Sequence, residues 1–118
     1  MRQIKKIGYL SLLSMLPFMS YADEGEDIYL RGGEQPQALA CVTCHGAEGQ
    51  GLAAAGYPNI TGMSADYLAK QLHDFQDGTR SHAIMDGIAG ALNDDEIEAV
   101  TLYMDGLQVQ GFPLITRA

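Results

Sequence analysis

Apolar side chains recur at helical spacing in two long segments of this chain. Within residues 64–78, Leu68, Leu72 and Phe75 are spaced i, i+4 and i+7, which places them on one face of a helix. The segment opens on a serine, a residue that often caps helices, and closes on a glycine, which often follows their last turn. This pattern predicts a helix with one buried face.

Residues 93–106 show the same kind of pattern closer to the C-terminus. Asn93 can cap a helix here, and Glu96 three residues later is the usual reciprocal partner in a capping box. The apolar stripe at helical spacing consists of Ile97, Val100, Met104 and Leu107. A shorter helix is predicted over residues 23–33, where acidic residues crowd the start and two glycines end the segment.

No segment alternates apolar and polar residues for long enough to predict a strand. The chain is therefore expected to be all-α, with three main helices. Between them lie two loops rich in glycine, proline and alanine, residues 46–62 and 78–92, which are long for so small a domain. Long loops in a compact domain usually serve a function. Loops wrapped around one prosthetic group would account for their length.

The first 22 residues have the composition of a secretory signal peptide. A basic start is followed by an apolar run of 13 residues and by small residues at positions 20 and 22. A membrane anchor or a buried core helix is the alternative, but a spanning helix needs about 20 apolar residues and this run contains Pro17. We expect cleavage after Ala22, one domain over residues 23–118, and no stable membrane insertion afterwards.

Cleavage would leave a strongly acidic domain. The signal region carries three of the seven basic residues and none of the fifteen acidic ones. The remaining four basic residues against fifteen acidic ones correspond to a net charge of −11 with histidine neutral. Phosphate binding needs clustered lysine and arginine, so no nucleic acid is expected as a partner. The acidity favours a basic or neutral partner surface, although solubility alone would explain it equally well.

The candidate chemistry lies in the sequence CVTCH, with Cys41, Cys44 and His45. Two cysteines separated by two residues and followed by histidine are the attachment signature of c-type haem. Two intervening residues let one helical turn bring both sulfurs to the edge of the macrocycle, and the next residue projects its imidazole toward the iron. A disulfide, a redox dithiol and half of a zinc site are the alternatives.

The rest of the sequence discriminates between these alternatives. A structural zinc site takes four ligands, usually in two pairs, and outside the motif the chain has only His73 and His82 as further histidines or cysteines. A thioredoxin-like dithiol belongs to a βαβ context that the pattern lacks. A disulfide would leave His45 without a role. The sequence therefore favours one covalently bound haem c.

The second axial ligand of such a haem lies outside the motif. The candidates are Met63, Met85, Met104, His73 and His82. Met104 belongs to an apolar stripe and His73 to the polar side of a predicted helix, which favours packing for the first and solvent exposure for the second. Met85 lies in the second glycine-bearing loop, which can bring a thioether across the haem face, and His82 in the same loop is its main rival.

Four stretches carry a resemblance to a known family. They are EGEDIYLRG, ACVTCHGAEGQG, YPNITGMSADYLAKQLHDFQDGTR and IMDGIAGALNDDEIEAVTLYMDGL, in this order. With them the sequence resembles a class I cytochrome c of the small bacterial monohaem kind, and single domains of two-haem periplasmic cytochromes. The resemblance implies the cytochrome c fold, thioether bonds at Cys41 and Cys44, and axial ligation by His45 and Met85. It also implies that the Pro58 carbonyl accepts a hydrogen bond from the His45 ring.

The same resemblance implies contact between the first and last helices, where Gly25 and Tyr29 meet the face around Tyr103. In function it implies a periplasmic one-electron transfer protein that performs no catalysis itself. The alternatives are the haem c subunit of a multi-subunit redox enzyme, such as a flavocytochrome c sulfide dehydrogenase, and a haem-based sensor or peroxidase with an open sixth position. The redox partner proteins are expected to dock through basic or apolar surfaces, and the protein to be a monomer or one subunit of a redox complex.

Overall fold

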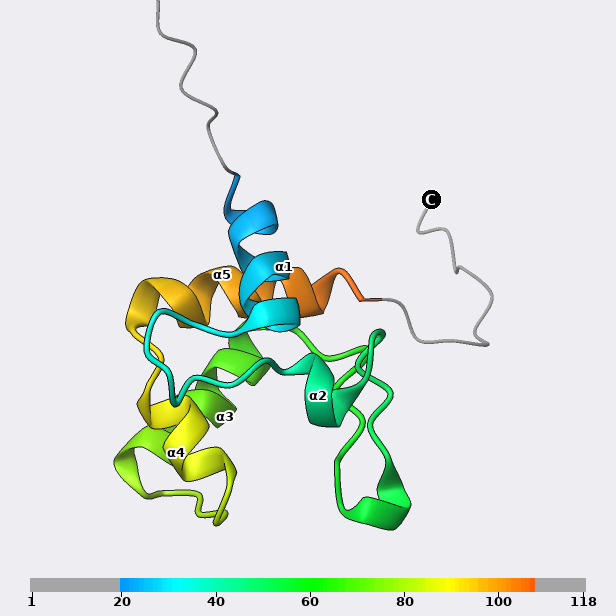
Figure 1. Ribbon diagram of the computed structural model, residues 1–118, viewed down its shortest axis with the longest axis vertical. Helices are drawn as coiled ribbons and strands as arrows, with labels where there is room; N and C mark the ends of the chain where they lie inside the picture. The colour runs from blue at the N-terminus through cyan, green and yellow to red at the C-terminus, as the bar shows by residue number, and fades with distance from the viewer. Residues whose placement is uncertain (1–19, 108–118) are drawn as a thin grey trace, which may run out of the picture.

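The computed structural model describes residues 20–107 of the chain (Figure 1). Its helices are α1 (Tyr21–Arg31), α2 (Val42–His45), α3 (Ala65–Asp77), α4 (Met85–Gly90) and α5 (Asp94–Asp105), with a 3-10 turn η1 (Ala53–Ala55) between α2 and α3. These residues contain no strand, and their only isolated bridge pairs Leu52 with Tyr57. In this part of the chain no helix is long and apolar enough to cross a membrane. The expected all-α fold is confirmed.

The three predicted helices all form, and local hydrogen bonds set where they begin. The Ser64 side chain caps α3, and Asn93 and Glu96 form the expected capping box of α5. Helix α1 begins two residues earlier than predicted, because Ser20 and Asp23 form a capping box of their own. Most of the predicted signal peptide, residues 1–19, lies outside the described residues.

Helices α1 and α5 cross in close contact at Gly25 (Figure 1). A β-carbon at Gly25 would overlap the carbonyl group of Ala99 and would lie 2.8 Å from Cβ of Tyr103. Glycine therefore lets the two backbones approach closely. One turn further along α1, the Tyr29 ring packs against the Tyr103 ring with their centroids 5.4 Å apart. The expected contact between the first and last helices is confirmed.

A single apolar core lies beside this crossing, where α3 packs against α5 and α4 packs against α3. The predicted apolar stripes of α3 and α5 both face this core. Its larger side chains are Ile28, Tyr29, Leu68, Leu72, Phe75, Leu92, Ile97, Val100 and Met104. The stripe positions therefore identified the buried faces of both long helices correctly.

Two short helices complete the described chain: α2 is the helical turn expected at the CVTCH motif, and α4 lies in the segment 78–92 that the sequence pattern left as a loop. Helix α2 is a single turn that carries the CVTCH motif, and α4 begins at Met85, which was expected in irregular chain. Helical periodicity needs a window of about 11 residues to become visible, and α4 has six, two of them glycine. The expectation of an irregular loop around Met85 was therefore wrong for residues 85–90.

We predict that Gly25→Ala lowers the free energy of unfolding by about 1–3 kcal/mol, because the new methyl group overpacks the crossing of α1 and α5. Gly90→Ala in α4 is a matched control, since a β-carbon there meets nothing within 4 Å. The control should be neutral or stabilising by up to about 1 kcal/mol. Chemical denaturation followed by circular dichroism measures both variants, and equal losses would contradict the close crossing.

Candidate haem-binding site

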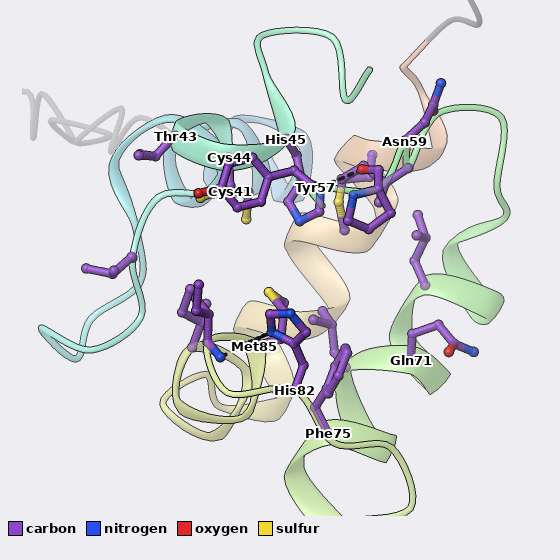
Figure 2. A pocket seen from close by; sticks show the side chains of 18 of the residues that line it. Cys41, Thr43, Cys44, His45, Tyr57, Asn59, Gln71, Phe75, His82 and Met85 are labelled. Atoms are coloured by element: carbon purple, nitrogen blue, oxygen red, sulfur yellow. Dashed lines mark hydrogen bonds between the residues drawn. The ribbon is translucent and has the colours of Figure 1, made fainter. Parts of the chain in front are cut away.

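A cavity of about 460 Å³ opens between α2, α3 and α4 (Figure 2). Its walls are mainly apolar and include Leu68, Leu72, Phe75, Ile84, Ile88 and Leu92. No aspartate or glutamate of the described residues lines it. Cavities of roughly 300–1,000 Å³ with apolar walls and a few placed polar groups are typical binding sites for cofactors. The cavity thus fits a large and mostly apolar group.

Helix α2 presents Cys41, Cys44 and His45 to this cavity (Figure 2). The turn is closed by a hydrogen bond from the His45 backbone N–H to the Cys41 carbonyl at 2.9 Å. Both cysteines are partly buried, and burial raises the pKa of the Cys41 thiol to about 11. One helical turn therefore brings both sulfurs and the imidazole to one side of the cavity, as the motif spacing predicted.

The His45 ring is oriented by the chain that returns 13 residues later. Its Nδ1 lies 2.9 Å from the carbonyl oxygen of Pro58. Because a carbonyl only accepts, Nδ1 donates this bond, and the neutral form of the ring then carries its proton on Nδ1 and not on Nε2. The contact expected between Pro58 and His45 is therefore present, and it fixes the tautomer in which Nε2 can act as a ligand.

Gly51 contacts both the His45 segment and the Pro58 segment, and the sequence interpretation gave it no role. Its N–H donates to the His45 carbonyl at 2.7 Å, and its φ of +67° lies in the left-handed region. A β-carbon at Gly51 would overlap the carbonyl groups of Tyr57 and Pro58. A larger residue would thus displace the carbonyl that accepts from the His45 ring. The glycine-rich stretch GAEGQG was visible in the sequence, but its contact with Pro58 depends on the path of the loop.

Met85 and His82 line the side of the cavity opposite His45 (Figure 2). Of the other candidate ligands, Met63 and Met104 also line the cavity, whereas His73 is exposed on α3 and does not line it. The structure thus brings together every predicted site residue around one cavity. Both Met85 and the rival ligand His82 lie on the wall opposite His45.

Arg80 is a cavity residue that the sequence interpretation missed. Its guanidinium group lies 4.6 Å from the centroid of the Phe75 ring and donates to Gln71 Oε1 at 2.8 Å. Among the described residues it is the sole lysine or arginine that lines the cavity. The sequence offered one sign of this role, the arginine of the stretch DGTR in the second long loop. A fixed cation at an apolar cavity suits a ligand with carboxylate groups.

Tyr29 connects the helix crossing to the attachment turn. The Tyr29 side chain is fully buried, and its hydroxyl donates to the carbonyl of Gly46, directly after His45, at 2.6 Å. Burial raises the pKa of this hydroxyl well above its usual value, so that it is a protonated donor at neutral pH. This hydrogen bond links α1 to α2 across 17 residues.

Few sites combine a Cys-x-x-Cys-His turn, an apolar cavity and a thioether on the opposite wall, and this combination is the one that c-type haem proteins use. A sequence model of the family described as Cytochrome c matches residues 22–108. The chain belongs to this family. The cytochrome c fold is thereby confirmed, and the domain binds covalent haem c, with CVTCH as its attachment motif.

Individual members of the family share a large part of this sequence. It is 44% identical over 104 residues to the thiosulfate dehydrogenase electron acceptor of Stutzerimonas stutzeri (strain A1501), covering 88% of this chain and 48% of that protein. It is 42% identical over 89 residues to cytochrome c4 of Pseudomonas aeruginosa, covering 71% of this chain and 44% of that protein. The chain thus spans about half the length of these relatives.

Solved structures show the same relationship. Reduced recombinant cytochrome c4 from Pseudomonas stutzeri superposes with a TM-score of 0.70 at 38% identity, over 75% of this chain and 48% of that one. The thiosulfate dehydrogenase of Marichromatium purpuratum gives a TM-score of 0.67 at 33% identity, over 73% of this chain and 18% of that one. The helical arrangement around the cavity is therefore that of the family.

We predict that Tyr29→Phe lowers the free energy of unfolding by about 1–2 kcal/mol, because the ring remains while the Gly46 carbonyl loses its donor. Because the pKa of Tyr29 is raised on folding, this difference should diminish above about pH 10, where the hydroxyl ionises in the unfolded chain first. Denaturation of the haem-loaded protein at several pH values measures both effects.

The matched control is Tyr103→Phe, because the Tyr103 hydroxyl makes no hydrogen bond with the described residues. This variant should stay within about 0.5 kcal/mol of the wild type. Equal losses in the two variants would mean that the Tyr29 hydroxyl contributes nothing beyond its ring.

Proposed function

We propose that this protein is a periplasmic one-electron carrier that holds a single haem c. Cys41 and Cys44 form the thioether bonds, and His45 and Met85 are the axial ligands. The observation that carries the proposal is the placement of His45 and Met85 on opposite walls of one apolar cavity. Pro58 supports it by accepting from His45 Nδ1 at 2.9 Å, which leaves the other ring nitrogen free to bind iron.

When bound, the haem supplies a one-electron couple between Fe(III) and Fe(II). The side chains around it set how easily the oxidised form is reduced. The Met85 thioether is a soft ligand that favours Fe(II), and it raises the reduction potential relative to a second histidine. The apolar walls act in the same direction, because they disfavour the extra positive charge of Fe(III). Residues of this chain therefore favour a carrier of relatively high potential.

Two protein ligands leave no position at the iron for a substrate, which is why we assign the domain a carrier role and no catalysis of its own. A sensor or a peroxidase needs an open or displaceable sixth position. Thioether ligation by Met85 favours the carrier, and absence of this ligand would favour a sensor or peroxidase.

The lining of the cavity differs in charge from the rest of the described surface, because it contains no acidic side chain of the described residues. Exposed acidic side chains occupy the first turns of α1 and α5, at Asp23, Glu24, Asp94 and Asp95. The cavity rim has exposed apolar residues instead, at Leu39, Tyr67 and Ile84. Apolar contact at the rim suits short-lived docking to a redox partner, and the acidic helix ends attract partners with basic surfaces.

A second candidate is a haem subunit within a larger redox enzyme. The observation that favours it is the 44% identity to a protein named thiosulfate dehydrogenase electron acceptor, together with the structural match to a thiosulfate dehydrogenase. A flavocytochrome c sulfide dehydrogenase is another enzyme of this kind. In either case the role of the domain is electron transfer, and the two candidates differ in whether a partner stays bound.

We predict that Met85→Leu abolishes the sulfur-to-iron charge-transfer absorption of the oxidised protein and lowers the reduction potential by on the order of 0.1 V. Leucine is close to methionine in size, so packing changes little while the ligand is lost. Visible spectroscopy during a redox titration measures both quantities in one experiment.

Met63→Leu is the matched control, because Met63 also lines the cavity but is not proposed as a ligand. This variant should keep the charge-transfer absorption band, and its reduction potential should stay close to that of the wild type. A Met85→Leu protein with an unchanged band would contradict axial ligation by Met85.

Native mass spectrometry of protein released from the periplasm distinguishes the two candidates. A free carrier should have the mass of residues 23–118 plus one haem, since cleavage is expected after Ala22. A stable assembly with a second redox protein would favour the enzyme subunit. A mass that includes Met1 would contradict the proposed signal cleavage, and a mass with two haems would contradict the single-haem carrier.

A further inference from the structure

We propose that His82 is a positioning residue that holds Met85 as the sixth ligand through its ring nitrogen Nδ1. The inference rests on the proposed axial role of Met85. His82 is exposed and lies three residues before Met85 on the same wall of the cavity, where its imidazole would otherwise be a rival ligand (Figure 2). The backbone contacts of its ring give it a different role.

The Nδ1 atom of His82 accepts hydrogen bonds from the backbone of the segment that carries the ligand. The N–H of Ile84 lies at 3.1 Å and the N–H of Met85 at 3.4 Å. Helix α4 begins at Met85, and the first N–H groups of any helix lack partners within the helix. Ile84, at the capping position, makes no side-chain cap. The His82 ring therefore supplies the missing cap from two residues further upstream.

A second set of hydrogen bonds holds His82 itself in place. Asp86 accepts from the His82 N–H at 2.9 Å through Oδ1 and from the Ser81 hydroxyl at 2.9 Å through Oδ2. The Asp86 N–H donates back to the His82 carbonyl at 3.0 Å. The turn from Ser81 to Asp86 is thus closed on both sides of Met85, which fixes the backbone from which the thioether projects.

These contacts also explain why the imidazole does not compete for the iron. A nitrogen that accepts from backbone N–H groups carries no proton, so the proton of the neutral His82 ring is on Nε2. A protonated ring nitrogen has no lone pair to offer a metal. His82 is thereby held in a tautomer unsuited to ligation, while Met85 is held in position. Such preorganisation strengthens a bond by reducing the ordering that its formation requires.

Competition by added imidazole measures how firmly Met85 is held. In the oxidised, haem-loaded protein, imidazole displaces the thioether and abolishes the sulfur-to-iron charge-transfer band. His82→Phe keeps a ring but removes the acceptor, and we expect it to bind imidazole about five- to tenfold more tightly, as for one lost hydrogen bond. His82→Asn restores an acceptor near the position of Nδ1, and its affinity should return to within about twofold of the wild type.

His73→Phe is the matched control, since His73 is exposed on α3, forms a ring hydrogen bond only with Gln76 among the described residues and does not line the cavity. It should leave the affinity for imidazole unchanged. An affinity for imidazole that is unchanged in His82→Phe would overturn the proposal. An affinity that is raised as much in His82→Asn as in His82→Phe would overturn it too. A wild-type protein without the charge-transfer band would instead refute ligation by Met85, so the two failures are distinguishable.

Discussion

The close crossing of α1 and α5 at Gly25 is the contact on which the rest of the structure depends. It brings Tyr29 into the core, where its hydroxyl reaches the carbonyl of Gly46 directly after the attachment motif. From there, Gly51 packs against the segment of Pro58, whose carbonyl orients the His45 ring. The orientation of His45, the proposed haem ligand, is thus linked, contact by contact, to the packing of the first and last helices.

The opposite wall of the cavity is built more locally. Met85 projects from a short helix whose start is held by side chains of the same turn, His82 and Asp86. One proposed ligand, His45, is therefore supported by long-range packing, and the other, Met85, by hydrogen bonds within six residues. In the proposed arrangement the covalent haem c lies between them, and a domain of this size gains apolar core from such a group that its own side chains cannot supply.

The lining of the cavity agrees with the proposed exchange of electrons through its rim. Acidic residues lie on α1, α3, α4 and α5, but no acidic side chain of the described residues lines the cavity itself. A long-range attraction and an apolar contact can therefore act at different places on the surface. This chain spans about half the length of the two relatives described above, the electron acceptor and cytochrome c4.

The sequence by itself determined the helices with long apolar stripes, their caps at Ser64 and Asn93, and the CVTCH motif. All of these depend on residues within one to three helical turns of each other, so local spacing is sufficient to read them. It also placed Met85 and Pro58 at the site through resemblance to the family.

Only the tertiary structure decided which surroundings these residues have. The short helix α4, the donation from Tyr29 to Gly46 and the position of Arg80 over Phe75 left no periodic pattern. Each of the two side-chain contacts is made where separate elements or loops meet, so it is set by the path of the backbone and not by the spacing of residue types. The same holds for His82, which the sequence presented as a rival ligand. Its hydrogen bonds to the backbone of Ile84 and Met85 become visible only when the turn is folded.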